Sequence, residues 1–175
     1  MVNCDLILDF VNSLDLMPYG ETFDSPQALG AWLGERGLLD PSARVTATDV
    51  EEAKRVREAI RDLLSAHNEV TTDVAAASAA VDDAVCHAKL RLRFEDGRMK
   101  LEPASTGIRA ALGWILAEVA TAQADGTWER MKACRADDCR WAFLDTAKNR
   151  SRAWCSMQSC GNRAKVHAYR ERHGH

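Results

Sequence analysis

Two pairs of cysteines near the C-terminal end constrain the fold of this chain more than any other feature. Cys134 and Cys139 are separated by four residues, as are Cys155 and Cys160, and fifteen residues lie between the two pairs. Two such pairs can bring four thiolates into a tetrahedron, which is the closed geometry of a structural zinc site. The spacing therefore predicts one structural Zn²⁺ ion bound by these four residues, with no open position for a catalytic water.

Disulfides and an iron–sulfur cluster are the rival interpretations of the paired cysteines. The N-terminus lacks the order of basic, apolar and small residues of a signal peptide, and no stretch approaches the roughly 20 apolar residues of a membrane span. We therefore expect a cytoplasmic protein with no membrane partner, and in that compartment clustered cysteines are more often metal ligands than disulfides. The histidines His167, His173 and His175 are poorer candidates, because four better-spaced thiolates already fill the site.

Charge is distributed unevenly along the chain. Residues 1–129 carry 12 Lys and Arg against 22 Asp and Glu, whereas residues 130–175 carry 11 against 4. A zinc ion with four thiolates has a formal charge of about −2, which leaves the second region clearly basic. This asymmetry predicts two regions, 1–126 and 127–175, of which the second faces a polyanion.

The pattern of residues 1–126 predicts a mainly helical domain. Apolar residues at helical spacing, alanine-rich composition and helix-start or helix-stop signals predict helices over residues 6–14, 26–37, 48–67, 72–87 and 105–124. The first of these segments is too short for periodicity to separate a helix from a buried strand, and we favour a helix that Pro18 and Gly20 end. Thr48 and Glu51 have the spacing of a capping box for the third helix.

Two further segments predict β-structure. Residues 89–101 alternate polar and apolar side chains on either side of Asp96-Gly97, which predicts a hairpin. Between the cysteine pairs, Trp141, Phe143 and Leu144 predict a strand that packs beside the metal. The fold class is therefore a mainly α N-terminal domain with a small β-hairpin, followed by a small zinc-bound β-hairpin/helix module of treble-clef or ribbon-like type.

The module ends in a predicted helix over residues 160–172. We expect Cys160 in its first turn, where the positive helix end favours a thiolate, and we expect four residues to pack inward: Ala164, Val166, Ala168 and Tyr169. A core this small rarely holds a fold alone, so metal binding should also supply folding free energy.

The finger region resembles a known family nearly position for position. Residues 134–165 read Cys-x4-Cys-Arg-Trp-x-Phe-Leu-Asp-Thr-x-Lys-Asn-x-Ser-Arg-x-Trp-Cys-Ser-Met-x-x-Cys-Gly-Asn-Arg-x-Lys. This run resembles the bacterial CGNR-type zinc finger, whose name corresponds to residues 160–163 of this chain. In that family the finger follows a mainly helical domain called ABATE.

Residues 8–13, Leu-Asp-Phe-Val-Asn-Ser, look like the opening motif of the ABATE domain, and the later Ala31-Trp32-Leu33 and Gly37-Leu38 also fit. Together the two resemblances cover almost the whole chain. The family is described as stress-related transcriptional regulators, so the resemblance implies DNA binding.

Basic and amide side chains surround the predicted zinc site. Guanidinium groups bind phosphate oxygens bidentately and can contact guanine edges, while lysine acts more as a point charge. The candidate nucleic-acid-binding residues are Arg140, Lys148, Asn149, Arg150, Arg152, Arg163, Lys165, Arg170 and Arg172. For Trp141 and Trp154 we favour packing beside the metal over stacking on bases.

Asp9 and Asn12 are three residues apart and would share one face of a helix. They could line a pocket for a small-molecule ligand, although we favour capping or binding of buried backbone groups. The sequence contains no nucleophile motif or glycine-rich phosphate loop, so we do not expect an enzyme.

The leading hypothesis is a transcriptional regulator in which the finger binds DNA and the helical domain senses a signal or forms a homodimer. RNA is an open alternative polymer for the same basic surface. The alternatives of other classes are a zinc-stabilised protein-interaction module and a ligand-binding helical domain without specific DNA binding.

Overall fold

The computed structural model describes residues 3–174. Outside the described residues lie Met1, Val2 and His175. The possible role of His175 as a zinc ligand therefore falls outside them as well. Within residues 3–174 the helices are α1 (Cys4–Val11), α2 (Pro26–Glu35), α3 (Ala47–Ala66), α4 (Val74–Ala88), α5 (Gly107–Asp125) and α6 (Asn162–His173). Antiparallel hairpins are formed by β1 (Leu14–Leu16) with β2 (Tyr19–Glu21), β3 (Leu90–Glu95) with β4 (Arg98–Pro103), and β5 (Met131–Ala133) with β6 (Ala142–Leu144).

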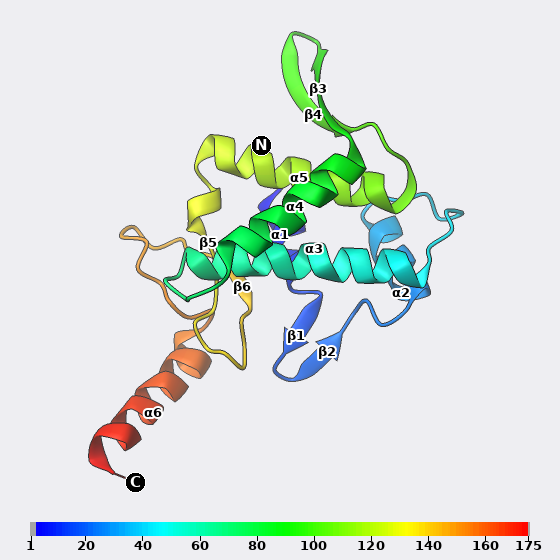
Figure 1. Ribbon diagram of the computed structural model, residues 1–175. Coiled ribbons are helices and arrows are strands. Elements are labelled where there is room, and N and C mark those ends of the chain that lie inside the picture. The colour runs from blue at the N-terminus through cyan, green and yellow to red at the C-terminus, as the bar shows by residue number, and fades with distance from the viewer. Residues whose placement is uncertain (1–2, 175) are drawn as a thin grey trace.

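Helix α3 lies across the centre of the molecule, with α4 and α5 on one side and the β1–β2 hairpin on the other (Figure 1). The core contains an aromatic cluster from α1, α2 and the segment between β2 and α2, in which Phe10, Trp32 and Phe23 have ring centroids 5.4–5.9 Å apart. None of the helices in residues 3–174 combines the length and apolar character that a membrane span requires.

The predicted mainly helical region with small hairpins is confirmed, with two corrections. The segment around Pro18 and Gly20 does more than end a helix, because it forms the β1–β2 hairpin. The capping box of α3 uses Thr46 and Asp49 in place of Thr48 and Glu51: the Asp49 carboxylate accepts the Thr46 backbone N–H at 2.8 Å, so the helix begins earlier than predicted.

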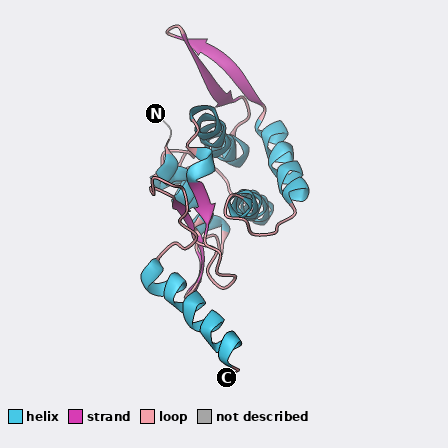
Figure 2. Ribbon diagram, turned by 90° about the vertical axis from the view of Figure 1, so that its left-hand side faces the viewer, coloured by secondary structure: helices cyan, strands magenta, loops and turns pink. Residues whose placement is uncertain are grey.

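The β3–β4 hairpin projects beyond the helices, as Figures 1 and 2 both show. Its turn has positive φ at Asp96 (51°) and Gly97 (74°), the conformation that lets a two-residue loop follow the twist of the strands. The following helix, α5, ends at Gly126 with φ of 77°, in agreement with the predicted stop.

We call residues 130–173 the finger. Its β5–β6 hairpin packs on the helical region, while α6 extends away from the body at the end opposite the β3–β4 hairpin (Figures 1 and 2). No residue of α6 is buried and Ala164 is half-buried, so the inward packing expected of Val166, Ala168 and Tyr169 is wrong. Cys160 lies in a π-helical turn, Met157–Gly161, that precedes α6, and not in the first turn of α6 itself.

Candidate metal centre and basic surface

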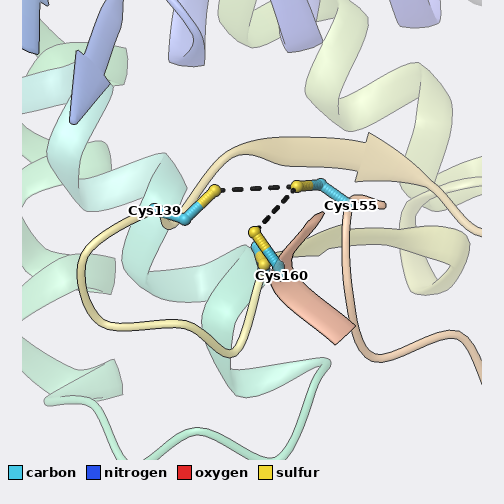
Figure 3. Close-up of side chains that lie close together, drawn as sticks. Cys139, Cys155 and Cys160 are labelled. Atoms are coloured by element: carbon cyan, nitrogen blue, oxygen red, sulfur yellow. Dashed lines mark hydrogen bonds between the residues drawn. The ribbon is translucent and has the colours of Figure 1, made fainter. Parts of the chain in front are cut away.

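The structure brings Cys134, Cys139, Cys155 and Cys160 together, with all four sulfur atoms within 4.8 Å of one another. Cys134 follows β5, Cys139 lies in the turn before β6, Cys155 precedes the π-helical turn and Cys160 lies within it. Figure 3 shows the side chains of Cys139, Cys155 and Cys160 pointing toward a common centre. Two cysteine pairs that fifteen residues separate in the sequence therefore supply one ligand set, as the spacing predicted.

The sulfur separations fit a tetrahedral metal site. Cys139 Sγ lies 3.6 Å from Cys155 Sγ, which lies 3.7 Å from Cys160 Sγ. With metal–sulfur bonds of about 2.3 Å, the edge of a tetrahedron of thiolates is about 3.8 Å. A disulfide requires a sulfur–sulfur bond of about 2.05 Å, and these cysteines are free. The donor set suits Zn²⁺, which favours four thiolates in closed structural sites.

Burial controls the protonation of the thiols. Burial raises the pKa of Cys139 to about 11 and, together with the neighbouring sulfur atoms, raises that of Cys155 further. Burial also acts to raise the pKa of Cys160, but hydrogen bonds from the other three thiols lower it below its ordinary value. A metal ion must therefore displace protons from this site, so metal binding is coupled to proton release.

Residues around the thiols hold the ligand turns in place. Trp141 and Trp154 pack against the cysteine cluster, as predicted. Gly161 has an ordinary helical backbone, but a Cβ atom there would lie 2.7 Å from Met157 Sδ and 3.2 Å from Trp154 Cδ1. The glycine therefore provides space for these two side chains beside the π-helical turn.

A buried ion pair fixes the loop that carries several of the basic residues, which we call the basic loop (residues 146–152). The Lys132 ammonium donates to Asp145 Oδ2 at 2.8 Å and to the backbone oxygen of Arg150 at 2.5 Å. Asp145 also accepts the backbone N–H groups of Ala147 and Arg152. Burial alone would raise the pKa of the Asp145 carboxyl, but the ammonium and the two amides lower it. Neither member of this pair was found from the sequence.

Polar side chains of the helical region bind the backbone of the finger. The Asn12 side chain donates to Ala142 O at 2.9 Å and accepts from Ala142 N at 2.7 Å. Asn68 donates to Ala133 O and Ala153 O, and the buried guanidinium of Arg61 donates to Arg140 O. The finger is therefore attached rigidly to the helices, since these bonds are made in a largely buried interface.

The structure separates the predicted nucleic-acid-binding residues into two groups. Three arginines make contacts that fix the shape of the finger, and their role as nucleic-acid contacts stays a prediction. Arg140 pairs with Asp62, Arg152 donates to the backbone oxygens of Trp154 and Cys155, and Arg163 pairs with Asp138 and lies 3.4 Å from Cys160 Sγ. The remaining predicted residues are exposed: Lys148, Asn149, Arg150, Lys165, Arg170 and Arg172.

The structure does not bring Asp9 and Asn12 into one pocket within residues 3–174. Asp9 pairs with Arg36 at 3.2 Å beside a surface hollow, whereas Asn12 caps α1 and binds Ala142. For Asn12 this is the role that we favoured from the sequence, because both polar atoms of its side chain bind the Ala142 backbone.

The fold and the cysteine cluster define a class: a mainly helical protein with a C-terminal zinc-finger-type metal site. Comparison with protein families specifies it further. Residues 5–127 match the ABATE family, described as "Putative stress-induced transcription regulator", and residues 130–173 match the CGNR zinc finger family. The chain belongs to the ABATE family and has its arrangement of an N-terminal ABATE region and a C-terminal CGNR zinc finger. Among curated proteins, none matches the chain.

Proposed function

We propose that this protein is a transcriptional regulator that binds duplex DNA through α6 and the basic loop, with one structural Zn²⁺ held by the four cysteines. The observation that carries the proposal is the exposure of α6. This helix of 12 residues is basic, contains no buried residue and projects from the body (Figure 2). A helix with these properties fits the major groove of B-DNA, which is about 12 Å wide.

The arrangement of side chains on α6 indicates which face meets the DNA. Ala164, His167 and Ala168 line a hollow against the cysteine turns, so this side faces the finger. At 100° per residue, Tyr169 lies on the opposite side, with Lys165 at its margin. Arg170 and Arg172 flank that face, and the basic loop adds Lys148 and Arg150. Within residues 3–174 these five cations are in no ion pair, so they can bind phosphates; Arg172 also donates to the backbone oxygen of Ala168.

The family description supports a role in transcriptional regulation, and the exposed helix α6 favours duplex DNA over duplex RNA as the partner. The major groove of an A-form RNA helix is too deep and narrow for side chains to read. Two finger arginines are neutralised by acids of the helical region, Arg135 by Glu69 and Arg140 by Asp62. The proposal therefore depends on the exposed cations and not on the net charge of the finger.

A salt titration tests the proposal. The zinc-loaded chain should bind a mixed-sequence DNA duplex with log K falling linearly against log [salt], with a slope corresponding to about three to five neutralised phosphates. Lys165→Ala and Arg170→Ala should each reduce the magnitude of the slope by about one. Arg91→Ala and Arg93→Ala, on the distant β3–β4 hairpin, should leave the slope unchanged. Absence of binding at 50 mM salt, a flat salt dependence, or equal effects of the hairpin and α6 variants would contradict the proposal.

A further inference from the structure

The β3–β4 hairpin has one apolar and one charged face. The register places Leu90, Leu92 and Phe94 opposite Pro103, Leu101 and Met99, all on one face. The other face carries the remaining residues of the two strands, all of them charged: Arg91, Arg93, Glu95, Arg98, Lys100 and Glu102. Such alternation is typical of a ribbon with one buried face.

The body of the protein covers only the base of the apolar face. Leu90, Leu101 and Pro103 are partly buried, and Pro103 lies close to Gly113 of α5. Toward the tip, the exposed fractions are 63% for Leu92, 74% for Phe94 and 61% for Met99. A two-stranded hairpin is marginal in water unless its apolar face packs against something. The exposed tip therefore indicates an interaction surface.

A hollow of about 530 Å³ lies beside the hairpin, between β4 and α5. It is lined by small residues of α5 and by Trp114, which is 42% exposed, and on the hairpin side by Leu92, Met99, Lys100 and Leu101. The small residues are Ala117, Ala120, Thr121 and Ala124. One surface thus offers both protruding apolar side chains and a hollow that can receive them.

We propose that a second copy of this chain covers this surface, with the tip of each hairpin inserted into the hollow of its partner. A patch that contains both a protrusion and a matching hollow is self-complementary, which is the requirement of a two-fold interface. Charge complementarity also favours a second copy. Glu118 lines the hollow, and Lys100, which also lines it, is already paired with Glu95. Arg98 at the tip is in no ion pair within residues 3–174.

The area is sufficient for a dimer. With side-chain surfaces on the order of 150–250 Å², the exposed parts of four apolar residues present roughly 450 Å² per protomer. These residues are Leu92, Phe94, Met99 and Trp114. Two copies, with the flanking backbone and polar atoms, reach about 1,200 Å², the lower end for a specific interface. Because the hairpin and α6 lie at opposite ends of the molecule, the two fingers of the dimer remain far from the interface (Figure 1).

Sedimentation velocity on the full zinc-loaded chain tests this inference independently of DNA binding. The wild-type chain should show a concentration-dependent monomer–dimer equilibrium between 1 and about 200 µM. Phe94→Asp and Leu92→Asp should each raise the dimer dissociation constant at least about tenfold, because a charge cannot be buried without a partner. Ala124→Arg, which fills the hollow at an exposed helix position, should have the same effect.

Tyr19→Asp is the matched control, since Tyr19 is 75% exposed on the β1–β2 hairpin, and it should leave the dissociation constant unchanged. Each variant alters an exposed side chain, and far-UV circular dichroism with zinc analysis verifies that it is folded. A wild-type chain that remains monomeric throughout would overturn the inference. So would a Phe94→Asp chain that dimerises like wild type, or an Ala124→Arg chain whose dimer is unaffected.

Discussion

Replacing Lys132 by methionine tests whether a buried ion pair fixes the basic loop. The side chain of Asp145 is 0% exposed and that of Lys132 7% exposed, so the substitution leaves a buried carboxylate without its cation. Removing one partner of a buried pair costs about 3–5 kcal/mol. Since Asp145 keeps two amide donors, we expect the lower end, about 3 kcal/mol. In a chain of this size that corresponds to a fall in Tm of roughly 6–12 °C.

Two measurements on zinc-loaded protein verify this prediction. Urea unfolding gives the change in the free energy of unfolding, and limited trypsin digestion reports on the loop, because Lys148 and Arg150 are cleavage sites within it. Lys132→Met should accelerate cleavage at Arg150. The control Lys148→Met makes the same chemical change at an exposed site and should alter stability by less than about 0.5 kcal/mol. The reasoning is refuted if Lys132→Met costs under 1 kcal/mol, or if its loop is cleaved no faster than that of wild type.

Three further perturbations have defined outcomes. Removing the metal with a chelator at pH 7 should expose the finger to trypsin while most helical circular dichroism persists, because most residues of the main hydrophobic core belong to the helical region. Unchanged digestion would contradict this. Gly113→Ala should destabilise by about 1–2 kcal/mol despite better helix propensity, because the new Cβ lies 2.8 Å from Ala88 Cβ and Pro103 Cβ. Gly34→Ala, whose Cβ meets only ordinary contacts, should instead stabilise by up to about 1 kcal/mol. Burial acts to raise the pKa of Glu21, but the Arg57 guanidinium lowers it overall. The Glu21 carboxylate therefore contributes fully to the free energy of unfolding above about pH 4.3, and this contribution is lost as the pH falls further. The stability difference between wild type and Glu21→Gln should therefore shrink below that pH in urea titrations, and a difference that grows in acid would refute the assignment.

The elements that the sequence predicted are those specified by local signals. The cysteine spacing is such a signal, because each pair is confined to one turn, and the glycine turn of the β3–β4 hairpin is another. The three-residue strands β1 and β2 lack a long alternating pattern. Pro18 and Gly20 therefore predict only the end of a helix, and not the hairpin that forms there. Apolar residues of α6 predicted packing, but a pattern cannot show whether any partner surface lies opposite.

Sequence patterns do not predict polar contacts between residues far apart in the chain. Asn12 binds Ala142, 130 residues away, and Arg61 binds the backbone of Arg140. Nothing in the spacing of either residue identifies its partner. The same limit applies to Arg140, Arg152 and Arg163: their residue type predicts phosphate contacts, while their internal partners become apparent only in the folded chain.

X-ray absorption at the zinc edge of the purified chain tests the central claim most directly, namely that four cysteines hold one Zn²⁺ and thereby fix the basic surface. The account predicts one zinc per chain with a shell of four sulfur atoms at about 2.3 Å. A shell containing nitrogen or oxygen ligands in place of sulfur, or far less than one zinc per chain, would contradict it.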